Sequence, residues 1–127
     1  LIWLPPVTIF TTFTNSRTWY LFSMTKRAQL ISLLDDLQTE MDQQGLWEQQ
    51  APAPSAFDSS TPFFADTMAF SQWLQWVFIA RFRAILDADH PLPGQCDVSP
   101  MAEEALKGME QDVSEIIDLL KQFDEHF

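Results

Sequence analysis

Residues 57–86 read FDSSTPFFADTMAFSQWLQWVFIARFRAIL, and this stretch decides the fold. It holds most of the phenylalanines of the chain, and from about Phe70 to Leu86 it contains neither glycine nor proline. The helix predicted there carries apolar residues at i, i+3 and i+4 spacing, namely Phe70, Leu74, Val77, Phe78, Phe82 and Ile85. Trp73, Trp76 and Ile79 widen this face. Such a helix is typically a buried central one; the alternative is a helix partly exposed as a partner-binding face.

Three further helices are predicted around it. The first starts at Thr25 and ends before Gly45, and its apolar face consists of Leu30, Leu33, Leu34, Leu37 and Met41. The last runs from about Glu110 to Phe127 with the stripe Val113, Ile116, Ile117, Leu120, Phe123 and Phe127. A short helix begins at Ser99–Pro100, with the serine as its cap. Because no strand-like alternation occurs, we predict an all-α fold, a small bundle of about four helices around the Trp-rich central helix.

The segments before the central helix are rich in turn-forming residues. The linker from Glu48 to Ser60 contains an Ala-Pro repeat, which favours an extended path. Asp66 and Thr67 are predicted to cap the central helix or a turn that leads into it.

Residues 1–23 differ from the rest of the chain, because they contain no Asp or Glu, a proline pair and five threonines. The pattern fits neither a signal peptide nor a transmembrane helix. We expect this extension to lie outside the domain, with the start of the chain assigned too far upstream and Met24 as the initiator. The domain would then be residues 24–127. Native protein whose mass includes residues before Met24 would contradict this expectation.

The charge of the chain argues against direct nucleic-acid binding. The formal net charge is −11, from 7 Lys+Arg against 18 Asp+Glu. Nucleic-acid binders need clustered cations to displace phosphate counterions. The only close basic pairs here are Lys26–Arg27 and Arg81–Arg83. An acidic surface suits a basic protein partner, or serves solubility alone.

The sequence carries no recognisable catalytic or metal-binding motif. His90 and His126 have no second His or Cys at ligand spacing, and neighbouring carboxylates such as Glu103–Glu104 point in different directions on a helix. The single cysteine, Cys96, lies in a loop without an adjacent cation and is consistent with a reducing compartment. We therefore predict no catalytic residues, no metal and no cofactor.

A candidate binding patch surrounds the central helix. A polar rim around an aromatic groove is the usual anatomy of such a patch, and Trp and Arg are frequent hot-spot residues. The competing interpretation is that these side chains cap helices, pack in the core or solvate the surface, with arginine paired to a neighbour such as Asp87. The candidate residues are Phe63, Phe64, Asp66, Trp73, Gln75, Trp76 and Arg81.

The runs FDSSTPFFADTM, WLQWVFIARF and PLPGQCDVSPMAEEAL resemble the YqcC-like proteins, a family of small bacterial proteins of unknown function. The resemblance covers residues 24–127 and leaves residues 1–23 outside. One departure is Ala80, where the family pattern has a proline before the arginine. The resemblance implies an all-helical protein that is often encoded beside a tRNA pseudouridine synthase. Because the single cysteine is compatible with a reducing compartment, we expect a cytoplasmic location.

Two functions follow as hypotheses. The first is a non-enzymatic interaction or adaptor module that partners a tRNA-modifying enzyme, with no direct contact to nucleic acid or membrane. The second is a small-molecule-binding helical domain with an apolar pocket beside the Trp-rich helix. A homo-oligomer and an enzyme with an unrecognised site remain further alternatives.

Overall fold

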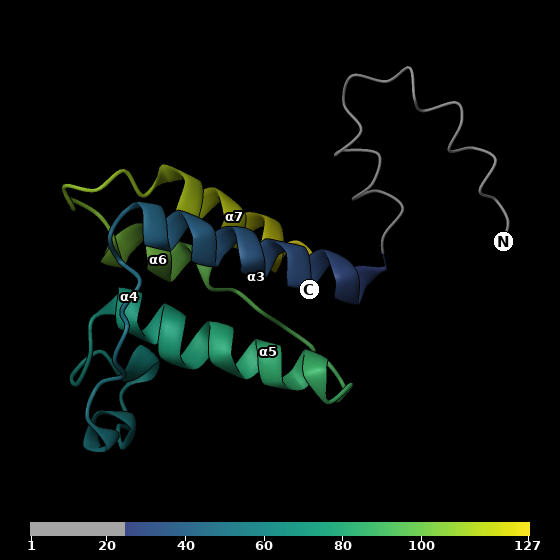
Figure 1. The fold of residues 1–127 in the computed structure, drawn as a ribbon, viewed down its shortest axis with the longest axis horizontal. Coiled ribbons are helices and arrows are strands. Elements are labelled where there is room, and N and C mark those ends of the chain that lie inside the picture. Colours follow the sequence, from purple (N-terminus) through teal and green to yellow (C-terminus); the bar gives the residue numbers. More distant parts are fainter. Residues whose placement is uncertain (1–24) are drawn as a thin grey trace, which may run out of the picture.

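The computed structural model describes residues 25–127, which form helices and no strand (Figure 1). The helices are α3 (Lys26–Gln43), α4 (Phe70–Trp73), a π-helical segment (Leu74–Ile79), α5 (Ala80–Asp87), α6 (Ser99–Ala105) and α7 (Ser114–Asp124). α4, the π-helical segment and α5 are continuous, so these residues contain four helices, one of them short. The all-α prediction is confirmed. The expectation for residues 1–23 and Met24 lies outside the described residues.

α3 and α7 lie side by side and antiparallel, and the α4–α5 helix runs along the other side of α3 (Figure 1). Arg27 joins the start of α3 to the loop after α5, because its Nη2 donates a hydrogen bond of 2.7 Å to the carbonyl oxygen of His90. At the other end of α3, Gln44 Oε1 accepts a hydrogen bond of 3.2 Å from the backbone N–H of Asp112. α6 packs on α7.

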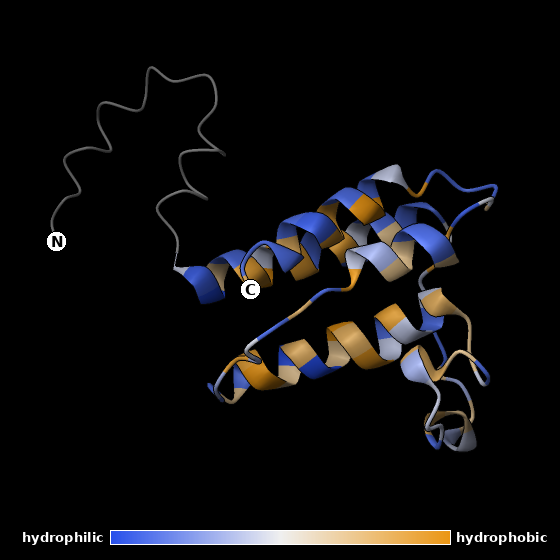
Figure 2. Cartoon of the chain, turned by 180° about the vertical axis from the view of Figure 1, so that it is seen from behind, coloured by the Kyte–Doolittle hydropathy of each residue, from blue (hydrophilic) through white to orange (hydrophobic). Residues whose placement is uncertain are grey.

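The core forms where the helices meet. Its largest fully buried side chains are Leu30, Leu34, Leu37, Met41, Leu74, Ile79, Leu106, Ile116, Leu120 and Phe123. The predicted face of α3 is buried except for Leu33, which is half-buried. Along α5, Ala80, Arg81 and Ala84 are exposed. Figure 2 shows hydrophobic residues on most turns of the α4–α5 helix. The central helix is therefore buried on nearly all sides along the π-helical segment, as predicted, and on one side only along α5.

Aromatic rings connect the segment before α4 with the C-terminus. Phe63 meets Trp73 with ring centroids 4.8 Å apart, and contacts then continue through Phe78 and Phe82 to Phe123. Each such pair contributes about 0.5–1.5 kcal/mol beyond burial of its area. These rings, which we call the aromatic row, meet in tilted or edge-to-face arrangements and fix the direction in which the chain enters the central helix. Phe63 adopts φ +58°, which is uncommon for a phenylalanine, within the short 3-10 turn Pro62–Phe64.

The first helix begins where predicted, and Thr25 caps it, because its Oγ1 accepts a hydrogen bond of 3.1 Å from Ala28 N–H. The cap of α6 was predicted wrongly. The side chain of Ser99 does not cap this helix; the carboxylate of Asp124 on α7 accepts hydrogen bonds from the N–H groups of Val98 (3.1 Å) and Ser99 (2.8 Å).

The last helix starts later than predicted, at Ser114 rather than near Glu110. Gly108 adopts φ +81° and ends the preceding helical turn. Asp112 then forms a local turn, because its Oδ1 accepts hydrogen bonds from Ser114 N–H (3.1 Å) and Oγ–H (2.6 Å). Such side-chain turns compete with helix formation.

Of the two roles predicted for Asp66 and Thr67, the structure shows the second. Neither residue caps the central helix, whose N-cap is Ala69, with its N–H donating to Gln72 Oε1 at 2.8 Å. Both bond within the turns that lead into the helix, because Asp66 accepts a hydrogen bond from Ser59 and Thr67 donates to the carbonyl of Ala56 at 2.7 Å. The linker is not fully extended, since Pro54–Phe57 forms a 3-10 turn.

Candidate interaction surfaces

Glu48, the residue that follows Trp47, is held by three side chains of the central helix. Its carboxylate accepts hydrogen bonds from Gln72 Nε2 (3.1 Å) and Trp76 Nε1 (3.2 Å). Gln75 binds its backbone twice, because Oε1 accepts from Glu48 N–H and Nε2 donates to Glu48 C=O, both at 2.8 Å. Gln75 is only 4% exposed. These contacts fix the start of the linker against the helix.

This linker attachment creates a hollow of about 350 Å³, which we call the tryptophan hollow. Its two indole rings, those of Trp47 and Trp76, are half-buried. Arg83 at its edge is bonded to Asp35 Oδ1 (3.0 Å) and Gln38 Oε1 (2.9 Å) of α3, rather than to the predicted Asp87. The lining residues are Gln38, Trp47, Glu48, Gln49, Gln75, Trp76, Ile79, Ala80 and Arg83.

The predicted patch divides between different roles. Gln75 and Trp76 line the tryptophan hollow. Phe63 and Trp73 belong to the aromatic row, in which their half-buried rings pack edge-to-face against one another. The remaining three lie outside both: Phe64 is half-buried with φ +51°, Asp66 is exposed, and Arg81 is exposed without an ion pair to any described residue.

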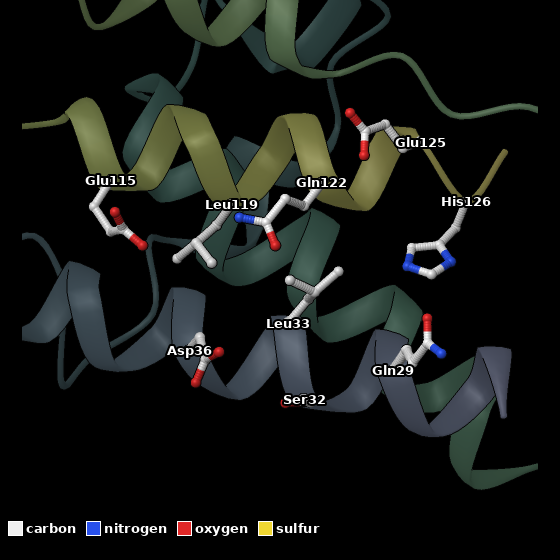
Figure 3. Close-up of a pocket in the computed structure, with 9 residues that line it drawn as sticks. All are labelled: Gln29, Ser32, Leu33, Asp36, Glu115, Leu119, Gln122, Glu125 and His126. Carbon is white, nitrogen blue, oxygen red and sulfur yellow. The ribbon is translucent and has the colours of Figure 1, made fainter. Parts of the chain in front are cut away.

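A second surface lies between α3 and α7, where two adjoining hollows of about 340 and 260 Å³ share Asp36, Glu115 and Leu119. We call this surface the acidic groove. In Figure 3, Leu33 and Leu119 lie between the helices, with Asp36 and Glu115 toward one end and Glu125, turned away from α3, toward the other. No Lys or Arg lines either hollow. The lining residues are Gln29, Ser32, Leu33, Asp36, Thr39, Glu40, Gln43, Glu115, Leu119, Gln122, Glu125 and His126.

Cys96 and His126 are two of the titratable groups whose pKa values are shifted by their surroundings. Burial, followed by the hydrogen bond from Sγ to Asp124 Oδ1 at 3.3 Å, raises the pKa of the Cys96 thiol to about 12. The thiol therefore stays protonated and unreactive at neutral pH. Partial burial and the positive charge of Lys26 lower the pKa of His126. Lys26 also lies over the ring of Phe127, 4.6 Å from its centroid.

Within residues 25–127, His, Cys, Asp and Glu side chains form no cluster that could hold a metal ion. None of the helices described is long and apolar enough to cross a membrane.

A model of the DUF446 family, described as tRNA pseudouridine synthase C, matches residues 29–126. The chain belongs to this family. Its relatives include an uncharacterised protein of Haemophilus influenzae, which is 46% identical over 81 residues, 64% of this chain and 76% of that protein. YqcC of Escherichia coli is 48% identical over 60 residues, 47% of this chain and 55% of YqcC. The resemblance to YqcC-like proteins is confirmed.

The fold of this DUF446 chain is shared with a solved relative. The solution NMR structure of Escherichia coli YqcC superposes with a TM-score of 0.71 at 35% identity, covering 81% of this chain and 88% of the other. A further relative is named tRNA pseudouridine synthase C, from Pectobacterium carotovorum. It is 37% identical over 70 residues, which are 55% of this chain but only 19% of that protein.

The acidic groove was not predicted from the sequence, nor was the role of Glu48 in forming the tryptophan hollow. Glu48 lies in a segment predicted to be a linker. The spacing of Gln72, Gln75 and Trp76 places their polar groups on one helix face, which could have indicated a shared polar partner. The groove depends on how α3 and α7 are rotated toward one another. That rotation follows from packing and leaves no local signal in either helix.

Proposed function

We propose that this domain is a non-enzymatic adaptor that docks on a tRNA pseudouridine synthase. The observation that carries the proposal is the relative named tRNA pseudouridine synthase C, in which a segment similar to this chain makes up 19% of the length. Covalent linkage keeps that segment at a high local concentration beside the rest of the synthase. A separate chain can be held beside the synthase by docking on it non-covalently.

Charge supports a protein partner rather than tRNA itself. Arg17 is the only charged residue before Met24, so residues 24–127 carry 6 Lys+Arg against 18 Asp+Glu, a net charge of −12. A domain of this charge repels a phosphate backbone. Enzymes that bind tRNA present Lys and Arg to its phosphates, and such a basic surface is complementary to an acidic one.

The acidic groove suits this contact best. Asp36, Glu40, Glu115 and Glu125 supply carboxylates, and Leu33 offers apolar contact between them. Opposite charges steer association and set orientation, whereas apolar contacts in the centre supply affinity. The proposal implies a cytoplasmic location, where tRNA is modified.

The test is capture of the partner from native lysate with the tagged full chain. We expect a tRNA pseudouridine synthase to co-elute in near-equal amounts. Glu115→Lys, which reverses a charge shared by both hollows of the groove, should lower recovery by about fivefold or more. Glu104→Lys is the matched control, because Glu104 is exposed on α6 and lines neither hollow.

Elution of the folded chain without a synthase contradicts the adaptor proposal. Equal capture by Glu115→Lys and the unchanged chain contradicts only the assignment of the groove.

A further inference from the structure

The tryptophan hollow has the composition of a small-molecule site and is separate from the acidic groove. Its volume of about 350 Å³ falls at the lower end of the range of about 300–1,000 Å³ that is typical of ligand pockets. Trp47, Trp76, Ile79 and Ala80 make its apolar wall. Ligand sites usually combine such a wall with a few fixed polar groups.

The charged groups at the hollow are already paired within the protein. The Glu48 carboxylate accepts hydrogen bonds from Gln72 and Trp76, and the Arg83 guanidinium binds Asp35 and Gln38. Asp35 neutralises Arg83 at 3.0 Å, whereas the donors that hold Glu48 are uncharged, so its carboxylate keeps its negative charge. This carboxylate and the net charge of −12 on residues 24–127 disfavour an anion, and the cation that lines the hollow, Arg83, is already bound to Asp35.

The Trp76 side chain offers a ring face rather than a hydrogen-bond donor. The indole N–H of Trp76 is occupied by Glu48, at 3.2 Å, so this side chain presents its π surface. The amide of Gln75 is occupied at both ends by the Glu48 backbone. Gln49 makes no hydrogen bond to the part of the chain that the structure describes, so its exposed amide can donate to and accept from a ligand.

The backbone of the central helix is irregular at the tryptophan hollow. Gln75, Trp76 and Ile79 all come from the π-helical segment Leu74–Ile79. π-Helical turns are rare inside α-helices and frequently occur at functional sites.

We propose that the tryptophan hollow binds an uncharged, planar aromatic molecule of one or two rings, free in solution. The ring stacks on the exposed indole surfaces, which attract any flat π system, and the Gln49 amide bonds to its edge. The tryptophan hollow shares no residue with the acidic groove. If the hollow binds no ligand, the adaptor proposal is therefore unaffected.

The test uses saturation-transfer NMR on the full chain with adenosine as the probe. We expect the base protons to receive more saturation than the ribose protons, because the base stacks on indole. AMP, which adds a phosphate to the same base, should bind several-fold more weakly in this acidic protein.

Two matched substitutions locate the binding. Ala80→Leu fills the hollow from an exposed helical position that accepts leucine well, and it should weaken adenosine binding by about tenfold or more. Ala84→Leu makes the same change one turn further along α5, outside the hollow, and should leave binding unchanged. No saturation at millimolar adenosine, AMP binding as tight as adenosine, or full binding by Ala80→Leu would each overturn the proposal.

Discussion

Replacement of Gln75 by leucine tests the attachment of the linker to the central helix. Leucine has a similar size but cannot make the two hydrogen bonds of 2.8 Å to the backbone of Glu48. Each bond contributes about 1 kcal/mol net, and leaving the partly buried N–H and C=O of Glu48 unpaired costs about 1–3 kcal/mol more. Better burial of an apolar side chain offsets part of this loss. We expect the free energy of unfolding to fall by about 1–3 kcal/mol.

Urea unfolding of the full chain measures this change as a lower midpoint at constant slope. Hydrogen exchange supplies a local readout, since the Glu48 amide should lose protection. Gln50→Leu serves as the control, because Gln50 is exposed and lies outside the contact. A loss below about 0.5 kcal/mol, the range of ordinary surface substitutions, together with unchanged protection of Glu48 would refute the reasoning.

Three further predictions concern the titratable groups. Asp124→Ala leaves the N–H groups of Val98 and Ser99 at the start of α6 unpaired. Chemical denaturation should show the free energy of unfolding lowered by about 2–4 kcal/mol. The control, Asp118→Ala on the exposed side of α7, should change it by less than about 0.5 kcal/mol. The raised pKa of Cys96 means that the folded state retains a proton that the unfolded state loses. Stability should therefore fall as the pH rises above about 8.5, and alkylation of the native thiol by iodoacetamide at pH 8 should be far slower than in denaturant. Because the pKa of His126 is lowered in the folded state, that state binds fewer protons than the unfolded state, and stability should decrease as the pH falls through about 6.5. An NMR titration of the imidazole with a midpoint above about 6.5 would contradict this prediction.

Much of the fold could be read from the sequence because it is encoded locally. The apolar spacing of Leu30, Leu34, Leu37 and Met41 determines which face of α3 is buried. Capping by Thr25 is a contact within one turn, so it was also predictable. The cap of α6 was not, because its acceptor, Asp124, lies 25 residues away on another helix.

The candidate site was predicted less well for the same reason. Aromatic composition marked the region around Trp73 and Trp76 but could not tell which ring packs inward. The structure places Trp73 in the aromatic row and Trp76 at the hollow, three residues apart on one helix. That choice depends on Phe63 and Glu48, which reach the helix from loops whose paths the sequence does not specify.

The most direct test of the adaptor proposal is isothermal titration of the purified full chain into a purified tRNA pseudouridine synthase from the same source. The proposal predicts a 1:1 complex at about 0.1 M salt that weakens markedly at about 0.5 M, because added ions screen the contact between acidic and basic surfaces. Absence of binding at about 0.1 M salt, where screening is modest, would contradict the proposal.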